Sequence, residues 1–240
     1  MLRTSYRLSK PDFGLFINGK EFFPGPNAQF PIENPATGKF ILHCVQASKD
    51  DIYSTIAIAH DRYVQGVWSR ADARDRSKVL FSIANSIKKN ITRLADLEVA
   101  QTGRTKREMT AQLMRVPEWF DYYGSLVCNQ EGSTVPYVGR HLSYVKRVPW
   151  GVCGLLTPWN QPILSAVKKI APALACGNSL VVQPSELAPA SIVELAKLCS
   201  ESGLPGMCAS SSSSNPRYAH RWSHLLYMCR WRLQRADGNR

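Results

Sequence analysis

Two short apolar runs that alternate with two helical patterns, between residues 151 and 203, constrain the fold of this chain more than any other feature. Each apolar run is typical of a buried strand, and each helical pattern ends at a glycine. The expected elements are strands over 151–156 and 179–182 and helices over 162–176 and 190–202. Because such a strand–helix–strand unit joins its strands by a right-handed crossover, the sequence predicts an α/β fold with a parallel sheet.

A hairpin and a further strand precede this region. Asn18-Gly19 separates two short runs, 15–17 and 20–22, and this dipeptide readily adopts the two positive φ angles of a tight hairpin turn. A second turn over 34–38 leads into the apolar run 40–45, which is typical of a strand. The N-terminal part of the chain therefore begins with β-structure.

Helical patterns follow, up to about residue 132. Their start and stop signals predict helices from Ser48 to Gly66, from Ser69 or Asp72 to Gly103, and from Thr105 onward. Pro117 requires a kink or a restart in the last of these. The aromatic side chains beyond it follow helical spacing without interleaved Lys or Arg, which favours core packing over a base-stacking platform: Trp119, Phe120, Tyr122 and Tyr123.

The positive charge is concentrated at the C-terminal end. The net charge is +12, but residues 208–240 hold six Arg, no Lys and one Asp, which leaves 24 basic and 17 acidic side chains in residues 1–207. The main body is therefore only mildly basic, and the charge does not by itself indicate a nucleic-acid-binding protein. No secretory signal or membrane-spanning run is visible, so we expect a cytoplasmic protein.

The cysteines give no sign of a metal centre or of a disulfide framework. All seven lie far apart, without a CxxC pair and without His at metal-ligand spacing: Cys44, Cys128, Cys153, Cys176, Cys199, Cys208 and Cys229. We expect reduced and mostly buried thiols and no metal site.

The segment 149–186, PWGVCGLLTPWNQPILSAVKKIAPALACGNSLVVQPSE, resembles the beginning of the cofactor domain of the NAD(P)-dependent aldehyde dehydrogenase superfamily. Three motifs occur in the same order and spacing, namely PWN after a strand, PALACGN, and PSE after the next strand. Upstream, FINGKEF, ENPATGK and EVAQTGR are also similar to that family. The resemblance covers residues 13–207 and implies a doubly wound, Rossmann-like sheet of which this chain holds only a part.

For the domain organisation, the resemblance implies four parts. Residues 1–132 are the hairpin and helical part of the cofactor domain, and 133–148 form an extended arm that resembles an oligomerisation strand pair. Residues 149–207 begin the NAD-binding domain. Residues 208–240, which include five consecutive serines, form a disordered or frame-shifted tail.

The family reaction is the oxidation of an aldehyde to a carboxylic acid. A cysteine thiolate adds to the aldehyde, hydride passes to the nicotinamide, and water hydrolyses the resulting thioester. Asn160 matches the family's oxyanion asparagine, whose amide donates to the oxygen that becomes negative. Without the motif, an Asn at this place would be interpreted as closing a strand-to-loop turn.

The resemblance also implies a set of cofactor-binding residues at two strand ends: Leu156, Thr157, Pro158, Trp159, Asn160, Gln183, Ser185 and Glu186. Glu186 matches the ligand of the adenosine ribose, and it can equally act as a first-turn charge at a helix N-terminus. Gln183 stands where the family has Lys. Since an amide supplies no charge for a 2′-phosphate, we expect NAD rather than NADP, bound with reduced affinity.

The chain departs from the family after Met207. The further parallel strands, the general-base glutamate and the nucleophilic cysteine do not follow, and neither Cys153 nor Cys176 matches the nucleophile motif. Two parallel strands with their helices leave an incomplete sheet with an open edge. We hypothesise a frameshift or misread splice junction near Met207, and we expect the chain to be inactive by itself.

Two other functions stay open. The chain could be a non-catalytic interaction protein whose hairpin and arm co-assemble, as a homo- or hetero-oligomer, with full-length aldehyde dehydrogenase subunits. It could alternatively bind nucleic acid or an acidic surface through its Arg-rich tail, with Trp222 or Trp231, although no recognised fold supports this. We expect a small-molecule aldehyde as the partner of the complete enzyme, and no membrane.

Overall fold

The computed structural model describes residues 11–23, 29–136, 139–140, 142–205 and 209–210. Nine strands are described: β1 (Leu15–Ile17), β2 (Lys20–Phe22), β3 (Gln29–Asn34), β4 (Lys39–Val45), β5 (Ser133–Val135), β6 (Ser143–Val145), β7 (Val152–Leu156), β8 (Ser179–Gln183) and β9 (Ala209–Ser210). The helices are α1 (Lys49–Gln65), α2 (Ala73–Thr102), α3 (Lys106–Leu113), α4 (Val116–Leu126), the 3₁₀ turn η1 (Val127–Asn129), α5 (Pro162–Ala175) and α6 (Ala190–Glu201).

The central sheet confirms the α/β prediction. Its order is β2-β1-β9-β8-β7, with β7, β8 and β9 parallel and the β1–β2 hairpin antiparallel at one edge. The sequence predicted two parallel strands, but the structure has three. The third, β9 (209–210), lies in the segment that was assigned to the tail, and it pairs with β8. β8 is nearly all buried, so an unpaired edge there would leave backbone groups without hydrogen-bond partners. The rest of the tail lies outside the described residues.

The predicted turns and helix ends are confirmed. Asn18 and Gly19 have φ angles of 52° and 78° in the β1–β2 turn. Ser48 and Asp51 form a reciprocal capping box at the start of α1, and Gly103 is the left-handed cap that ends α2. Pro117 lies in the first turn of α4, so the helical region restarts there. β3 and β4 form a separate antiparallel pair, and so do β5 and β6.

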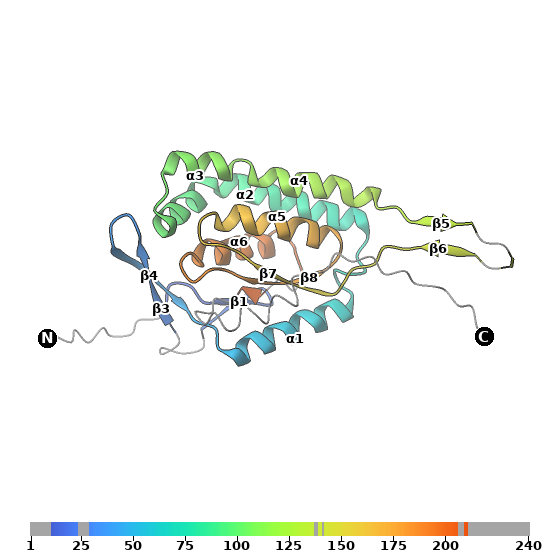
Figure 1. The fold of residues 1–240 in the computed structure, drawn as a ribbon, viewed down its shortest axis with the longest axis horizontal. Helices are drawn as coiled ribbons and strands as arrows, with labels where there is room; N and C mark the ends of the chain where they lie inside the picture. The colour runs from blue at the N-terminus through green and yellow to red at the C-terminus, as the bar shows by residue number, and fades with distance from the viewer. Residues whose placement is uncertain (1–10, 24–28, 137–138, 141, 206–208, 211–240) are drawn as a thin grey trace.

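Helices cover both faces of the central sheet (Figure 1). α1 lies on one face, and α5 and α6 lie on the other, beneath an outer layer of α2, α3 and α4. The main core lies between these helical layers and includes Leu80, Ile83, Phe120 and Ile170, which are almost completely buried. The β5–β6 arm projects from one end of this layered body.

Side chains of α2 cap the two helices that follow the parallel strands. Neither α5 nor α6 has a side-chain cap of its own. Glu98 Oε1 accepts from the backbone N–H of Ile163 at 2.7 Å, and Gln101 Oε1 accepts from that of Ala190 at 2.9 Å. Both bonds satisfy N–H groups of a first helical turn, which would otherwise be buried without a partner.

The C-terminal end of α5 is held in a similar way. Trp68 Nε1 donates to Leu174 O at 3.1 Å, and Arg76 Nε donates to Ala175 O at 3.2 Å. Asn178, which is 1% exposed, then joins this helix end to β7. Its Oδ1 accepts from the backbone N–H groups of Trp150 and Gly151, and its Nδ2 donates to Ala173 O. The start of β7 is thereby placed beside the end of α5.

We predict that Asn178→Ala lowers the free energy of unfolding by about 2–4 kcal/mol, because the N–H groups of Trp150 and Gly151 lose their acceptor together. Ala173 O keeps its bond from the backbone N–H of residue 178. Urea denaturation monitored by circular dichroism measures this change. Asn85→Ala, at an exposed position of α2, is the control, and we expect it to change stability by less than about 0.5 kcal/mol. Equal effects of the two substitutions would contradict the role of Asn178.

Glu98 makes stability depend on pH. Burial raises the pKa of its carboxyl to about 7 from 4.5, although the hydrogen bonds from Ile163 and Ser191 oppose the shift. The folded state therefore holds this proton more tightly than the unfolded state does, and stability falls as the pH rises through the interval from about 4.5 to about 7.

We predict that Glu98→Gln loses about 2–3 kcal/mol less unfolding free energy between pH 4.5 and pH 8 than the unaltered protein does. The reason is that the amide has no proton to lose in this interval. The measurement is the urea unfolding free energy of both proteins at each pH. The difference between the two curves gives the contribution of the Glu98 carboxyl to the pH dependence, because all other titrating groups are present in both proteins. Parallel curves for the two proteins would show that Glu98 is not the source.

Candidate functional site

The two parallel strands that resemble the cofactor domain end side by side. Leu156 of β7 pairs with Gln183 of β8, and the backbone N–H of Thr157 donates to Gln183 O at 3.0 Å. The loops that leave these strands carry all the other residues predicted to bind the cofactor. Because ligands of doubly wound sheets bind outside the carboxyl ends of the strands, this edge is the candidate site.

Two polar atoms at this edge are buried without a partner. Thr157 Oγ1 and Gln183 Oε1 form no hydrogen bond with the described residues, although both side chains are less than a tenth exposed. Buried polar groups are almost always paired in folded proteins, so we expect a water molecule or a bound ligand to supply the partner of each atom. Hydroxyl and amide groups match the hydroxyl-rich ribose of a dinucleotide, and the residues therefore fit this cofactor.

The first loop presents Asn160 at the surface. Pro158, Trp159 and Asn160 are exposed, and Asn160 forms no hydrogen bond with any described residue. Its amide is therefore available to a bound molecule. α5 begins two residues later at Pro162, where Glu98 holds its first turn. The short connection keeps Asn160 between the end of β7 and the start of this helix.

The second loop forms a tight turn. Ser185 Oγ accepts from the backbone N–H of Leu187 at 3.3 Å, and Ser185 O accepts from that of Ala188. Glu186 is exposed within the turn. The first turn of α6 contains no acidic residue, so the interpretation of Glu186 as a charge inside that turn is wrong. The structure leaves its carboxylate free to accept hydrogen bonds from a ligand.

Lys169 on α5 is a further residue of this edge that was not predicted from the sequence. Its Nζ donates to Leu156 O, the last carbonyl of β7, and burial lowers the pKa of this lysine. The bond fixes the strand end from which Thr157 and Asn160 follow. A lysine within an apolar helical pattern could have drawn attention to this residue. The pattern does not show, however, to which carbonyl the lysine donates.

None of the described cysteines lies in the two loops that leave β7 and β8 at the candidate site. Cys153 lies inside β7, paired in register with Leu180, and Cys176 caps the end of α5, as expected from the sequence. Burial raises the pKa of Cys44 and of Cys199 to about 12, so both are thiols at neutral pH. The described residues contain no cluster that could hold a metal ion.

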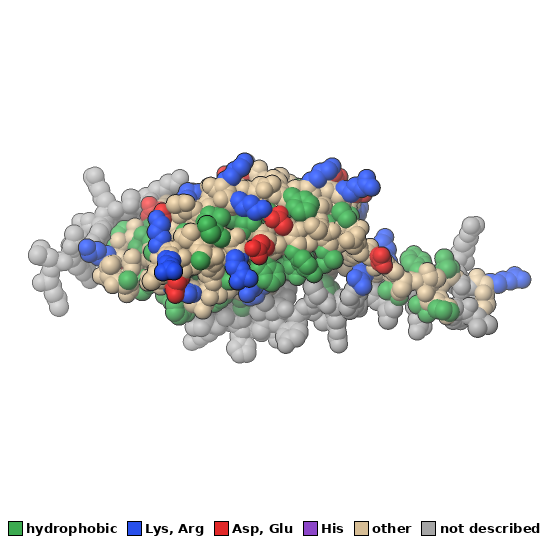
Figure 2. All heavy atoms as spheres, turned by 90° about the horizontal axis from the view of Figure 1, so that it is seen from above, with side chains coloured by type: hydrophobic (Ala, Val, Ile, Leu, Met, Phe, Trp, Pro, Cys, Tyr) green, Lys and Arg blue, Asp and Glu red, His purple; other side chains and the backbone are tan. Residues whose placement is uncertain are grey.

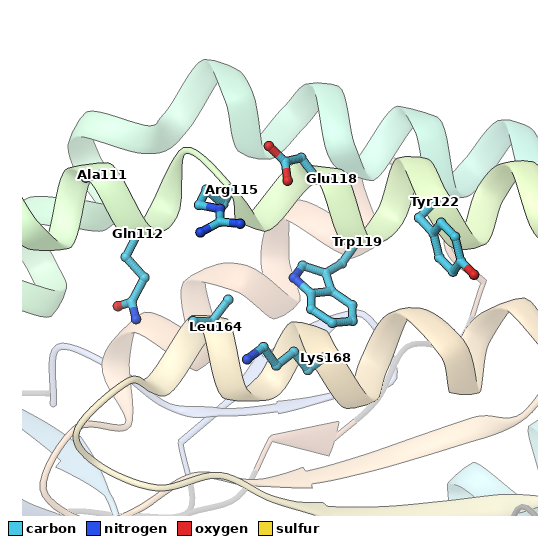
Figure 3. A pocket seen from close by; sticks show the side chains of 8 residues that line it. All are labelled: Ala111, Gln112, Arg115, Glu118, Trp119, Tyr122, Leu164 and Lys168. Carbon is cyan, nitrogen blue, oxygen red and sulfur yellow. The ribbon is translucent and has the colours of Figure 1, made fainter.

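A pocket of about 790 Å³ opens between α4 and α5 (Figure 3). Eight residues line it: Ala111, Gln112, Arg115, Glu118, Trp119, Tyr122, Leu164 and Lys168. It lies beside the helix that starts after Asn160. Of the aromatic cluster predicted to be core, Phe120 is fully buried, but Tyr122 is 61% exposed and Trp119 lines the pocket, because they lie on the face of α4 that meets this opening.

The outer helical face carries both charge signs (Figure 2). Basic and acidic side chains are interspersed there, which does not suit a phosphate-binding surface. The alternative of nucleic-acid binding through the Arg-rich tail concerns residues outside the described ones. Among the described helices, none is both long and apolar enough to cross a bilayer.

Comparison with known sequences matches the chain to a protein family. The model of the "Aldehyde dehydrogenase family" matches residues 22–210. A (Z)-2-((N-methylformamido)methylene)-5-hydroxybutyrolactone dehydrogenase of Acinetobacter baylyi is 34% identical over 87% of this chain and 45% of the relative. The betaine aldehyde dehydrogenase of Bacillus subtilis is 35% identical over 80% of the chain and 39% of the relative. The chain thus spans less than half the length of these curated relatives.

Solved structures agree with the sequence matches. The betaine aldehyde dehydrogenase of Staphylococcus aureus in complex with NAD+ superposes with a TM-score of 0.81 at 31% identity, covering 87% of this chain and 41% of that one. The shared fold confirms the incomplete, Rossmann-like sheet, and the family match includes both strand ends and Asn160. The chain belongs to the aldehyde dehydrogenase family.

Proposed function

We propose that this chain is the cofactor-binding part of an NAD-dependent aldehyde dehydrogenase, which oxidises an aldehyde to a carboxylic acid. The observation that carries the proposal is the pair of buried, unpartnered atoms Thr157 Oγ1 and Gln183 Oε1 at the ends of adjacent parallel strands. The NAD+ complex of the Staphylococcus aureus relative, at a TM-score of 0.81, supports the choice of cofactor.

Each predicted residue has a role that its surroundings support. Gln183 and Thr157 hold ribose hydroxyls from inside the sheet edge, and Glu186 accepts hydrogen bonds from the adenosine ribose at the exposed turn. Ser185 shapes that turn through its bond from the N–H of Leu187. The backbone at Leu156 and the exposed loop at 158–159 form the near wall of the cofactor site.

Asn160 is the catalytic residue that this chain contributes. Its free amide donates to the aldehyde oxygen as that atom gains negative charge, a contact that lowers a barrier by about 3 kcal/mol in comparable sites. Bound NAD supplies the acceptor for hydride. Lys169 and Glu98 act as positioning residues, since they fix the strand end and the helix start on either side of Asn160.

We further propose that the 240-residue chain does not oxidise aldehydes by itself. The described cysteines lie inside a strand, at a helix end or in the core, apart from the exposed Cys128 on η1. Arg76 interacts with Cys176 and with Cys128, but Cys176 lies at the end of α5 beside the start of β7, at the opposite edge of the sheet from the candidate site. In this proposal, the nucleophile and the general base lie outside the residues that the structure describes.

We predict that the chain binds NAD more tightly than NADP and that Gln183→Lys raises the affinity for NADP by about tenfold, because an ammonium group can pair with the 2′-phosphate. Isothermal titration calorimetry of both proteins with both cofactors measures the change. Gln183→Met is the control, with a similar shape and no charge.

Equal affinity of the unaltered chain for the two cofactors would contradict the preference for NAD. Failure to bind either cofactor, in a chain that circular dichroism shows to be folded, would contradict the proposed site as a whole. An increase of NADP affinity in Gln183→Met as large as in Gln183→Lys would show that charge is not the reason.

The projecting arm favours a second function, co-assembly with other aldehyde dehydrogenase subunits. β5 and β6 form an isolated antiparallel pair away from the body (Figure 1), and Figure 2 shows hydrophobic side chains on it. Val135 is 44% exposed, Tyr144 50% and Leu142 72%. Large apolar side chains on a two-stranded ribbon are typical of a surface that another chain covers.

We predict that this arm binds a full-length aldehyde dehydrogenase subunit and that Val135→Asp with Tyr144→Asp abolishes the binding, because two charges would be buried in the interface. Co-expression with a full-length subunit, followed by size-exclusion chromatography, gives the measurement. Lys89→Asp, at an exposed position of α2 outside the arm, is the control. Retention of the complex by the double variant would exclude the arm as the interface.

A further inference from the structure

The pocket between α4 and α5 has an unbalanced charge. Arg115, in the turn before α4, and Lys168, on α5, line it, and neither forms an ion pair with a carboxylate among the described residues. Glu118 is the one acidic residue of the lining (Figure 3). The lining therefore holds two basic side chains and one acidic side chain, an excess of positive charge.

The aromatic wall of the pocket already has a cation on it. Lys168 Nζ lies 5.5 Å from the centre of the Trp119 ring, within the range of a cation–π contact. A second cation placed near that face would meet the repulsion of the ammonium group. The aldehyde of the betaine aldehyde dehydrogenases is a quaternary ammonium compound, and this arrangement disfavours such a ligand.

The remaining lining suits a short carbon chain. Leu164 and Ala111 are apolar, and Trp119 stacks on Tyr123 with ring centres 6.5 Å apart. Gln112 Oε1 is buried without a hydrogen-bond partner among the described residues, so its amide is available to a polar group of the ligand. Along α5, Lys168 lies six residues after Pro162, a rise of about 9 Å, which separates Lys168 from the loop that carries Asn160.

We propose that this pocket binds the carboxylate of an aldehyde that carries an acid group at the end remote from its carbonyl, with Arg115 and Lys168 as the residues that recognise it. The inference rests on the proposed function, since it assigns the substrate class of the same enzyme. Arg115 offers two parallel N–H donors to a carboxylate, and Lys168 adds a point charge from the other side. The apolar lining holds the carbon chain between them and Asn160.

A matched pair of unreactive probes tests the charge preference on the chain itself. 5-Hydroxypentanoate and choline both end in a hydroxyl group and differ in the sign of the charge at the other end. We expect calorimetry at low ionic strength to show binding of 5-hydroxypentanoate, weakened by added salt, and at least about tenfold weaker binding of choline.

Variants then test the two residues. Arg115→Gln and Lys168→Gln are each expected to weaken 5-hydroxypentanoate binding about five- to tenfold, because each removes one charged contact. Lys78→Gln is the matched control, since Lys78 is a lysine on α2 outside this pocket and the net charge changes by the same amount. We expect it to leave the affinity unchanged, and circular dichroism verifies that all variants are folded.

Tighter binding of choline than of 5-hydroxypentanoate would overturn the inference, and so would equal losses in Lys78→Gln and Lys168→Gln. An NAD titration of the same preparations separates this outcome from a failure of the proposed function. If NAD binds normally while the carboxylate probe does not bind, the substrate class is wrong and the cofactor site stands. If NAD does not bind either, the proposed function fails together with the inference.

Discussion

The hydrogen bonds from α2 to the starts of α5 and α6 are the interaction on which the rest of this structure depends. α5 starts with Pro162, and α6 follows Pro189, and neither helix supplies a side-chain cap. Glu98 and Gln101 provide these caps across 65 and 89 residues of sequence. Without them, the first turns of both helices would bury unpaired N–H groups, at a cost of about 1–3 kcal/mol for each group. The outer helical layer and the parallel sheet are therefore one cooperative unit.

The same hydrogen bonds, together with those at the end of β7, determine the shape of the candidate site. The loop with Asn160 starts at a strand end held by Lys169 and by the bond from Thr157 N–H to Gln183 O, and it ends at a helix start held by Glu98. Both ends of the loop are thus fixed before any ligand binds. A side chain that is to stabilise a developing charge contributes most when it needs no reorganisation during the reaction, and such fixed ends reduce that reorganisation.

Features with local causes could be predicted from the sequence, and features that join distant segments could not. The Asn18-Gly19 turn, the capping box at Ser48 and the restart at Pro117 follow from a few neighbouring residues, and the structure confirms them. The strand ends with Thr157 and Gln183 were found through their resemblance to a family. By contrast, Glu98 was read only as part of a helical pattern, and the pairing of β9 with β8 was not expected, because each depends on a partner far away in the chain.

The cofactor edge and the α4–α5 pocket are built from different parts of this unit, so each can change without the other. Gln183 belongs to the sheet, and Thr157 follows directly after β7 and is joined to Gln183 by a backbone hydrogen bond. Arg115 lies in the turn before α4 and Lys168 lies on α5, both are exposed, and neither side chain caps a helix. Substitutions at such exposed positions cost little stability. They can therefore change the charge of the pocket, and with it the preferred substrate, while the fold and the cofactor site stay the same. This separation of the pocket from the cofactor edge explains how a pocket with two basic side chains can occur in a family that includes betaine aldehyde dehydrogenases.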